Sequence, residues 1–213
     1  MAEPVALVDD QNVVRAGIRR LLESTGEFEV VAEAADGRTA IEAVLKAKPS
    51  LLVLDVWLPK LSGIDVIREL HRQMPTLGIA VLSQQDRSDI VESALREGAS
   101  AYVHKSSAPE DLITALRAVR AGKCFVSPEV AGSVVHALSK PAAERSPASR
   151  LSGREREILQ LIADGLSSKE VASDLGLSTR TVETHRLSMM NKLDIHKVAG
   201  LVRFALREGM IRP

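Results

Sequence analysis

Acidic, hydroxyl and amine side chains follow apolar runs at four points in the first half of the chain. Asp9 and Asp10 come directly after VALV, and Asp55 comes directly after LLVL. Ser83 follows IAVL, and Lys105 follows AYVH. Phosphoryl transfer to a carboxylate uses this set of groups, because the carboxylate attacks while cations neutralise charge on the transferring oxygens. The residue types therefore predict a phosphoryl-transfer site with Asp55 as the nucleophile.

The three carboxylates of this set would repel one another at close range, so the cluster requires a cation. Oxygen ligands suit Mg²⁺, which favours sites that also hold phosphate. A plainer interpretation is that Asp9 or Asp10 caps a helix beginning near Gln11, and that Ser83 and Lys105 have no common role. Parallel sheets form their sites outside the carboxyl ends of the strands. Suitable groups at four such ends favour the magnesium and phosphoryl-transfer site.

The elements that must position these groups alternate between apolar runs and helical patterns over the first 121 residues. The runs predict strands at Val5–Val8, Phe28–Ala34, Leu51–Asp55, Ile79–Ser83 and Ala101–His104. Periodic segments predict helices at about residues 11–24, 37–48, 62–74, 87–97 and 108–121, the last with a capping box begun by Ser107. Five βα units in a row predict an α/β fold with a five-stranded parallel sheet, doubly wound by helices on both faces. In the usual strand order the first and third strands are neighbours, which brings the three carboxylates together.

The pattern becomes helical in the second half of the chain. A short helix is predicted from Pro128 to Leu138, and SKPAAERSPASR at residues 139–150 is typical of a linker, with two prolines and no large apolar side chain. Further on, Ser152 and Ser167 begin capping-box patterns, and Ser178 is placed to cap a third helix. Two short helices joined by a glycine-containing turn are typical of a helix-turn-helix. The predicted division is an α/β domain at residues 1–122, a short helix and linker at 123–150, and an all-α helix-turn-helix domain at 151–213.

The distribution of charge distinguishes the two halves. Residues 1–122 hold 14 basic and 18 acidic side chains, whereas residues 151–213 hold 10 and 8. This excess is compatible with nucleic-acid binding in the second half but is too small to establish it. A single cysteine, Cys124, argues against a disulfide framework and a zinc-binding cysteine cluster. No apolar run approaches the roughly 20 residues of a membrane span and the start shows no secretory signal, so we expect a cytoplasmic protein without a membrane partner.

Several of these motifs resemble those of a known family. VDD near the start, LDVWLP, VLS and HKS resemble the strand ends of the response-regulator receiver domain. The segment LSGREREILQLIADGLSSKEVASDLGLSTRTVETHRLSMMNKL resembles the LuxR-type helix-turn-helix. Together the two patterns cover nearly the whole chain, which is similar to the NarL/FixJ-type two-component response regulators. The resemblance implies a flavodoxin-like receiver domain followed by a DNA-binding domain.

The resemblance also implies roles at the acidic cluster. Asp55 would be the phosphoacceptor and would receive its phosphoryl group from a histidine of a sensor histidine kinase. Asp10 would bind Mg²⁺ directly, Asp9 mainly through water, and the backbone carbonyl of Trp57 would complete the metal site. Such a protein regulates transcription and is not an enzyme, although slow self-dephosphorylation is compatible with its chemistry.

Three further residues match the family's phosphoryl-binding and switch positions. Ser83 and Lys105 would contact the phosphoryl oxygens, and Tyr102 matches the aromatic switch. The alternative for Tyr102 is an ordinary half-buried strand residue. Phosphorylation would promote formation of a homodimer and tighter binding to promoter DNA, with RNA polymerase as a further partner.

The helix predicted after Ser178 has an outward face suited to base edges in the major groove. If Val182 points inward, helical spacing places four side chains on the outward face and Glu183 on its flank. The outward side chains are Arg180, Thr184, Leu187 and Asn191. By resemblance, Glu183, Thr184 and Leu187 read bases. The candidates for phosphate contacts are Ser178, Thr181, His185, Arg186 and Lys192. The alternative is a solvated helix face.

The last predicted helix, about His196–Glu208, carries an apolar arc wider than one core contact requires. Its members are Leu201, Val202, Phe204, Ala205 and Leu206. Members of the family dimerise through this helix, which fits the wide arc. The alternative is a plain buried helix.

Three candidate functions are consistent with this sequence. The first is a transcription factor controlled by phosphorylation of Asp55. The second keeps the DNA-binding domain but makes the receiver a phosphorylation-independent platform, which Trp57 and Gln84 favour mildly because the family often has smaller residues there. The third is an enzyme such as a phosphatase with Asp55 as nucleophile. Aspartyl phosphatases usually place two acids around one intervening residue, whereas Asp9 and Asp10 are adjacent, and no phosphate loop is present.

Overall fold

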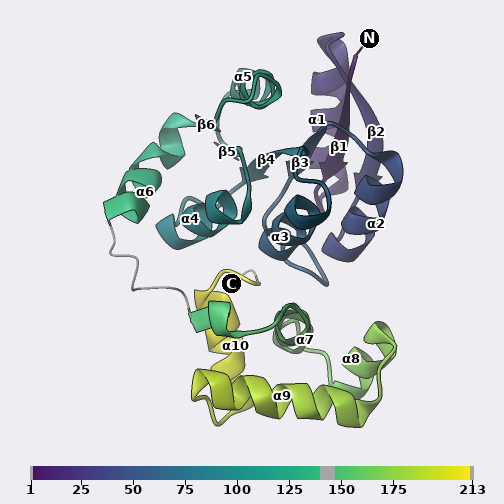
Figure 1. Ribbon diagram of the computed structural model, residues 1–213, viewed down its shortest axis with the longest axis vertical. Coiled ribbons are helices and arrows are strands. Elements are labelled where there is room, and N and C mark those ends of the chain that lie inside the picture. Colours follow the sequence, from purple (N-terminus) through teal and green to yellow (C-terminus); the bar gives the residue numbers. More distant parts are fainter. Residues whose placement is uncertain (1, 140–146, 212–213) are drawn as a thin grey trace. The chain divides into compact units, whose positions relative to one another are not determined.

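The computed structural model describes residues 2–139 and 147–211. The chain divides into two compact units, residues 1–140 and 141–213 (Figure 1). Most of the predicted linker, at 140–146, lies outside the described residues, and Pro147–Arg150 at its end form a short 3₁₀ helix. The short helix predicted before the linker is present as α6 (Pro128–Ser139), which belongs to the first unit.

A parallel sheet forms the centre of the first unit. Its strand order is β2-β1-β3-β4-β5-β6, so β1 and β3 are neighbours as predicted. The strands are β1 (Glu3–Val8), β2 (Phe28–Ala34), β3 (Leu51–Leu54), β4 (Gly78–Ser83), β5 (Ala101–His104) and β6 (Phe125–Val126). The prediction of a five-stranded sheet is wrong by one strand, because β6 pairs with Ala101 and Tyr102 at the edge. Two residues are too few to show the alternation from which a strand is predicted.

Helices cover both faces of this sheet (Figure 1). They are α1 (Asn12–Ser24), α2 (Gly37–Ala47), α3 (Gly63–Gln73), α4 (Ser88–Glu97) and α5 (Pro109–Arg120), together with α6. One apolar core lies between the sheet and α1 and α5, and a second lies between the sheet and α2, α3, α4 and α6. Leu51 and Val53 of β3 enter the first core, whereas Leu52 and Leu54 enter the second, which explains why this strand is apolar throughout. The doubly wound α/β fold is thus confirmed.

Side chains cap two helices of this unit but not a third. Asp36 caps α2 by accepting two hydrogen bonds from backbone amides of the first turn, and Ser62 caps α3 by accepting one. The capping box predicted at Ser107 is wrong, since Ala108 is the N-cap of α5 and no side chain caps it. The Ser107 hydroxyl instead donates to Glu129 in the first turn of α6 (2.6 Å). A partner distant in sequence has replaced the local one.

The described part of the second unit is helical. Its α-helices are α7 (Gly153–Ala163), α8 (Ser168–Leu175), α9 (Thr179–Leu193) and α10 (Val198–Arg207). The capping boxes at Ser152 and Ser167 and the cap at Ser178 are confirmed. Gly176 ends α8 in the left-handed conformation (φ 63°) that turns the chain toward α9. Across both described segments, no helix has the length and apolar character that a membrane span requires.

Candidate functional site

The acidic cluster predicted from the strand ends is present at the carboxyl end of the sheet. Carboxylate oxygens of Asp9, Asp10 and Asp55 all lie within 4.8 Å of one another. The strands β1 and β3 bring them together, because they pair with Val8 opposite Leu54. Asp9 and Asp55 are buried and Asp10 is half-buried. Buried carboxylates at this spacing require positive charge nearby.

Lys105 supplies positive charge to this cluster. Its ammonium lies 2.6 Å from Asp9 Oδ2 and 2.7 Å from Asp55 Oδ2. Its backbone amide donates to the Ser83 carbonyl (2.8 Å), which fixes the lysine just beyond β5. Burial disfavours the charged ammonium, but the charges and hydrogen bonds of Asp55 and Asp9 outweigh burial, so the pKa of Lys105 is raised. Lys105 is therefore a cation beside Asp55 at neutral pH.

Asp55 also receives hydrogen bonds on its second carboxylate oxygen. The Ser83 hydroxyl donates to Oδ1 over 3.0 Å, and the Trp57 amide donates to the same atom over 3.2 Å. Gly63, at the start of α3, approaches the Asp55 backbone so closely that a Cβ there would lie 2.4 Å from its carbonyl oxygen. Strand, loop and helix together fix this carboxylate in one position, as a nucleophile requires.

The donor set of the cluster fits Mg²⁺. Asp9, Asp10 and Asp55 offer carboxylate oxygens, the hard ligands that this ion prefers, and they are close enough to share one ion. Within the described residues, no other group of three or more His, Cys, Asp or Glu side chains is close enough to hold a metal. The cluster is therefore the candidate metal site of this chain.

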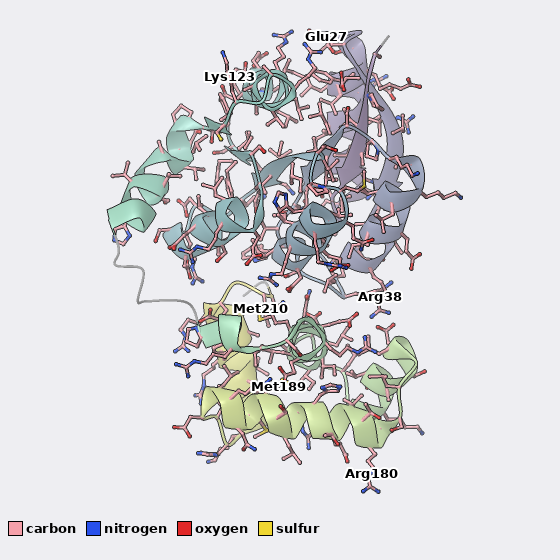
Figure 2. The ribbon with its side chains drawn as sticks, viewed as in Figure 1. Glu27, Arg38, Lys123, Arg180, Met189 and Met210 are labelled. Carbon is pink, nitrogen blue, oxygen red and sulfur yellow. The ribbon has the colours of Figure 1, made fainter. Side chains whose placement is uncertain are left out.

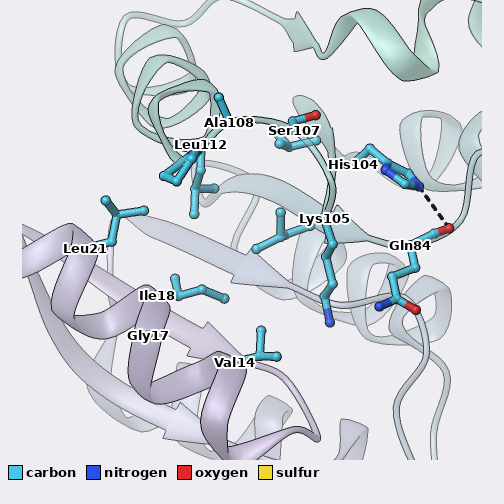
Figure 3. A pocket seen from close by; sticks show the side chains of 13 residues that line it. Val14, Gly17, Ile18, Leu21, Gln84, His104, Lys105, Ser107, Ala108 and Leu112 are labelled. Carbon is cyan, nitrogen blue, oxygen red and sulfur yellow. Dashed lines mark hydrogen bonds between the residues drawn. The ribbon is translucent and has the colours of Figure 1, made fainter.

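Three successive backbone carbonyls in the β4–α4 loop, those of residues 84–86, contact side chains of β5 and α6. The Gln84 carbonyl lies 3.1 Å from His104 Nε2 (Figure 3), and the Gln85 carbonyl accepts from the Tyr102 hydroxyl (2.8 Å). The Asp86 carbonyl accepts from the Ser133 hydroxyl. Tyr102 is fully buried rather than half-buried, and burial raises its pKa well above the ordinary value. Because Ser83 immediately precedes this loop, a movement of Ser83 would strain all three contacts.

A cavity of about 410 Å³ lies beside Lys105, between α1 and α5 (Figure 3). Side chains such as Ile18 and Leu112 make much of its lining apolar. Gln84 lines this cavity and is exposed, whereas the half-buried Trp57 packs against the core on the other face of the sheet. Of the two large residues noted near the acidic cluster, Gln84 is thus the one that borders this cavity.

The outward face predicted for α9 is exposed in the second unit. Val182 and Met189 are fully buried, whereas the residues predicted to point outward are exposed: Arg180, Glu183, Thr184, Leu187 and Asn191. Figure 2 shows Arg180 projecting away from its helix. Leu187 is 60% exposed although it is aliphatic. The face offers both charged and apolar groups, as contacts to base edges require.

Hydroxyl groups at the start of α9 are engaged with the helix itself. Ser178 Oγ lies 2.8 Å from Thr181 Oγ1 and accepts from the Thr181 amide (3.0 Å). The Thr184 hydroxyl donates to the Arg180 carbonyl (2.9 Å). Because this hydroxyl is bonded within the helix, the methyl group is the remaining group that Thr184 offers to a base.

Two of the basic side chains predicted to contact phosphate, Arg186 and Lys192, have partners within the second unit. Arg186 is half-buried, with Nη1 3.4 Å from Ser168 Oγ, and its buried Nε has no hydrogen-bond partner among the residues that the structure describes. Lys192 is exposed, yet its ammonium lies 2.7 Å and 2.8 Å from the two carboxylate oxygens of Glu155 in α7. His185 is half-buried. The contacts of these residues with DNA stay a prediction.

Glu155 is a functional candidate that the sequence analysis misses. Its buried carboxylate accepts from the Ser152 amide (2.7 Å) and the Ser188 hydroxyl (2.7 Å) as well as from Lys192. Burial by itself raises the pKa of Glu155, but hydrogen bonds from Lys192, Ser152 and Ser188 outweigh burial and lower it to about 2. The capping-box pattern identifies Glu155 as a cap residue, but no spacing rule connects it with α9.

The apolar arc of α10 is largely used inside the second unit. Leu201, Phe204 and Ala205 are buried in its core, which agrees with the plain buried helix for these positions. Val202 is half-buried and Val198 is 43% exposed. The use of this helix in dimerisation stays a prediction.

Two family models match the chain. Residues 5–117 match the response regulator receiver domain, and residues 149–205 match the bacterial regulatory proteins of the luxR family. The chain belongs to the response regulators. The transcriptional regulatory protein MctR of Rhizobium johnstonii is 33% identical to it over 207 residues, which are 97% of this chain and 94% of MctR. The oxygen regulatory protein NreC of Staphylococcus haemolyticus is 34% identical over 213 residues, covering 97% of this chain and 98% of NreC.

Solved structures of the response regulator RcsB are similar to this one. A structure of two RcsB dimers bound to two parallel DNAs is 29% identical with a TM-score of 0.60, and covers 96% of this chain and 98% of that chain. RcsB from Salmonella enterica serovar Typhimurium, bound to promoter rprA in the presence of phosphomimetic BeF3⁻, is 30% identical with a TM-score of 0.59, covering 95% and 97%. The predicted family is confirmed: this is a NarL/FixJ-type response regulator, with a receiver domain and a LuxR-type DNA-binding domain.

Proposed function

We propose that Asp55 accepts a phosphoryl group from a sensor histidine kinase, and that this modification controls dimerisation and sequence-specific binding to promoter DNA. One observation carries the proposal: the buried Asp55 carboxylate lies within contact distance of Lys105 and Ser83 and shares a cluster with two further carboxylates. These are the nucleophile, the charge-neutralising groups and the cation site of a phosphoryl-transfer centre.

The transfer requires one bond to form and one to break. A carboxylate oxygen of Asp55 attacks the phosphorus of the kinase's phosphohistidine, and the phosphorus–nitrogen bond breaks as the phosphorus–oxygen bond forms. The imidazole leaves with the bonding electron pair and takes a proton from water. Lys105, already charged 2.7 Å from Asp55, neutralises the phosphoryl oxygens, and Ser83 turns its hydroxyl from Asp55 to one of them.

Mg²⁺ would be held by the acidic cluster and by the backbone carbonyl of Trp57. Asp10 and Asp55 would be direct ligands, and Asp9 would act mainly through water. When bound, the ion offsets the negative charge of the cluster and polarises a phosphoryl oxygen. The carboxylate oxygens of Asp9, Asp10 and Asp55 support this assignment, because they lie within 4.8 Å of one another and can share one ion.

The β4–α4 loop supports a route from Asp55 to the surface of the receiver. If Ser83 moves toward a phosphoryl oxygen, residues 84–86 follow, and Tyr102 loses its present acceptor, the Gln85 carbonyl. Tyr102 then moves as the switch residue and changes the surface formed by α4 and α5. This change would favour the homodimer, in which two DNA-binding units act together.

We infer that α9 enters the major groove of the promoter DNA. We also propose that the protein acts in the cytoplasm, with RNA polymerase as a further partner. The exposed residues Glu183, Thr184 and Leu187 would read bases, and Arg180 extends the same face. Phosphates would be contacted from the start and sides of the helix, by Ser178, Thr181, His185 and Arg186. Such contacts position a protein without specifying a sequence.

The test compares the wild-type protein with Asp55→Asn, each incubated with Mg²⁺ and its cognate kinase. Size-exclusion chromatography and DNA-binding curves are measured before and after phosphorylation. We expect a shift to the dimer and tighter binding for the wild type alone. Identical elution and identical binding curves with and without phosphorylation would instead support the phosphorylation-independent platform.

A further inference from the structure

A buried carboxylate connects the first helix of the DNA-binding unit with the C-terminal half of α9. Glu155 is anchored at the start of α7 by the reciprocal capping box with Ser152. From that fixed position it accepts hydrogen bonds from Ser188 and Lys192. These two residues are four apart, so they lie on one side of α9, next to the face that carries Leu187.

We propose that Glu155 is a positioning residue that fixes the rotation of α9 for base reading, and that Lys192 serves this internal role instead of binding DNA phosphate. The inference rests on the proposed base-reading function of α9. It assigns to Glu155, Ser188 and Lys192 a part in sequence preference although none of them touches a base.

Apolar contacts constrain the rotation of a helix less sharply than directional hydrogen bonds do. Val182 and Met189 hold α9 against the core, but apolar burial is non-directional and tolerates small rotations. Hydrogen bonds to a fixed carboxylate are directional, with distances of 2.7 to 2.8 Å at Glu155. The hydrogen bond from Arg186 Nη1 to Ser168 Oγ in α8 is longer than those at Glu155, at 3.4 Å. A rotation of α9 that displaced Ser188 would displace the adjacent Leu187 through the same angle.

The ion pair also limits what Lys192 offers to DNA. Its charge is balanced by Glu155, whose side chain is 4% exposed. A phosphate that drew the ammonium away would leave a buried carboxylate without its cationic partner, which is strongly unfavourable. Removing the charge of Glu155 would instead free the ammonium, and a free lysine at a phosphate steepens the salt dependence of binding.

Three full-length variants separate these roles. Glu155→Gln keeps the shape and removes the charge, and the double variant Glu155→Gln/Lys192→Met removes the pair without changing the net charge. Glu157→Gln, on the same helix and paired with Arg154, is the matched control for loss of one acidic charge. Each protein is used for selection from random-sequence duplexes. Binding to the motif that the wild type recovers, and to the random pool, is then measured across salt concentration.

We expect Glu155→Gln to lose roughly 10-fold in preference for the motif over the random pool, about the loss of one base contact. Its binding to the random pool should become tighter, with a salt slope steeper by about 0.9. The double variant should show the same loss of preference with the wild-type slope. Glu157→Gln should keep the motif. Ser188→Ala changes no charge and should weaken the preference in the same direction, which tests the proposal even if Glu155→Gln does not fold.

Several results would contradict the proposal. If the salt dependence of DNA binding by Glu155→Gln/Lys192→Met is shallower than that of the wild type by about 0.9, Lys192 binds phosphate directly. Recovery of the wild-type motif at full information content by Glu155→Gln or, where that variant does not fold, by Ser188→Ala would overturn the positioning role. A loss of preference by Glu157→Gln equal to that of Glu155→Gln would overturn it as well. If the wild type itself selects no motif, base reading by α9 fails together with this inference.

Discussion

Protonation of Glu155 is expected to destabilise the DNA-binding unit as pH falls. Burial raises the pKa of this carboxylate, but hydrogen bonds from Lys192, Ser152 and Ser188 outweigh burial and lower it from 4.5 to about 2. A pKa that is lower in the folded state contributes stability above the unfolded pKa, and this contribution is lost as pH falls from about 5 toward 2. At about 1.4 kcal/mol per pKa unit, and with some screening because Lys192 is 41% exposed, it amounts to about 2–3 kcal/mol in the free energy of unfolding.

Urea unfolding of the wild type and Glu155→Gln over this pH range measures the contribution. Trp57 is the only tryptophan in the chain and lies in the receiver, so its fluorescence follows that domain. Far-ultraviolet circular dichroism follows the helices of both units. A change in circular dichroism at urea concentrations where Trp57 fluorescence stays constant therefore reports unfolding of the DNA-binding unit. We expect the wild type to be more stable at neutral pH by about 2 kcal/mol, with the difference vanishing near the folded pKa. A difference that is absent at neutral pH, or constant with pH, would refute the reasoning.

Three other substitutions give separate tests. Gly63→Ala would place a Cβ 2.4 Å from the Asp55 carbonyl oxygen. We therefore expect slower phosphorylation in a kinase assay and a lower thermal midpoint of unfolding. An unchanged rate of phosphorylation would contradict the close packing of α3 on Asp55. Tyr102→Phe removes the donor to the Gln85 carbonyl and should lower receiver stability by about 1 kcal/mol, measured by Trp57 fluorescence in urea. Leu187→Ala should relax base preference at one position by about 1–3 kcal/mol in selection from random duplexes, and an unaltered motif would argue against base reading by this face.

The regular elements could be predicted because local chemistry determines them. The apolar run of β3 is buried on both faces, and the serines at 152, 167 and 178 cap the helices that follow them. The acidic cluster follows from topology, because Asp9 and Asp55 directly follow β1 and β3, which are neighbours in the β2-β1-β3 order. Parallel strands with a known order therefore predict which strand-end residues meet.

The remaining features depend on contacts between distant parts of the chain. The Ser107 hydroxyl donates to Glu129 instead of capping its own helix, and the pairing of β6 with β5 follows from the path of the chain after α5. Glu155 satisfies a local pattern completely, so nothing in its spacing indicates the second set of bonds to Ser188 and Lys192. Side-chain contacts of this kind emerge only from the packed structure.

The most direct test of the central claim is the mass of the intact protein after reaction with Mg²⁺ and its cognate kinase. Asp55 is the proposed nucleophile, and Lys105 and Ser83 lie on its two carboxylate oxygens. The wild type should gain about 80 Da as a phosphoryl group that hydroxylamine removes, which is characteristic of an acyl phosphate, and Asp55→Asn should gain nothing. A hydroxylamine-labile gain of the same mass in Asp55→Asn would contradict the assignment of Asp55 as the phosphoacceptor.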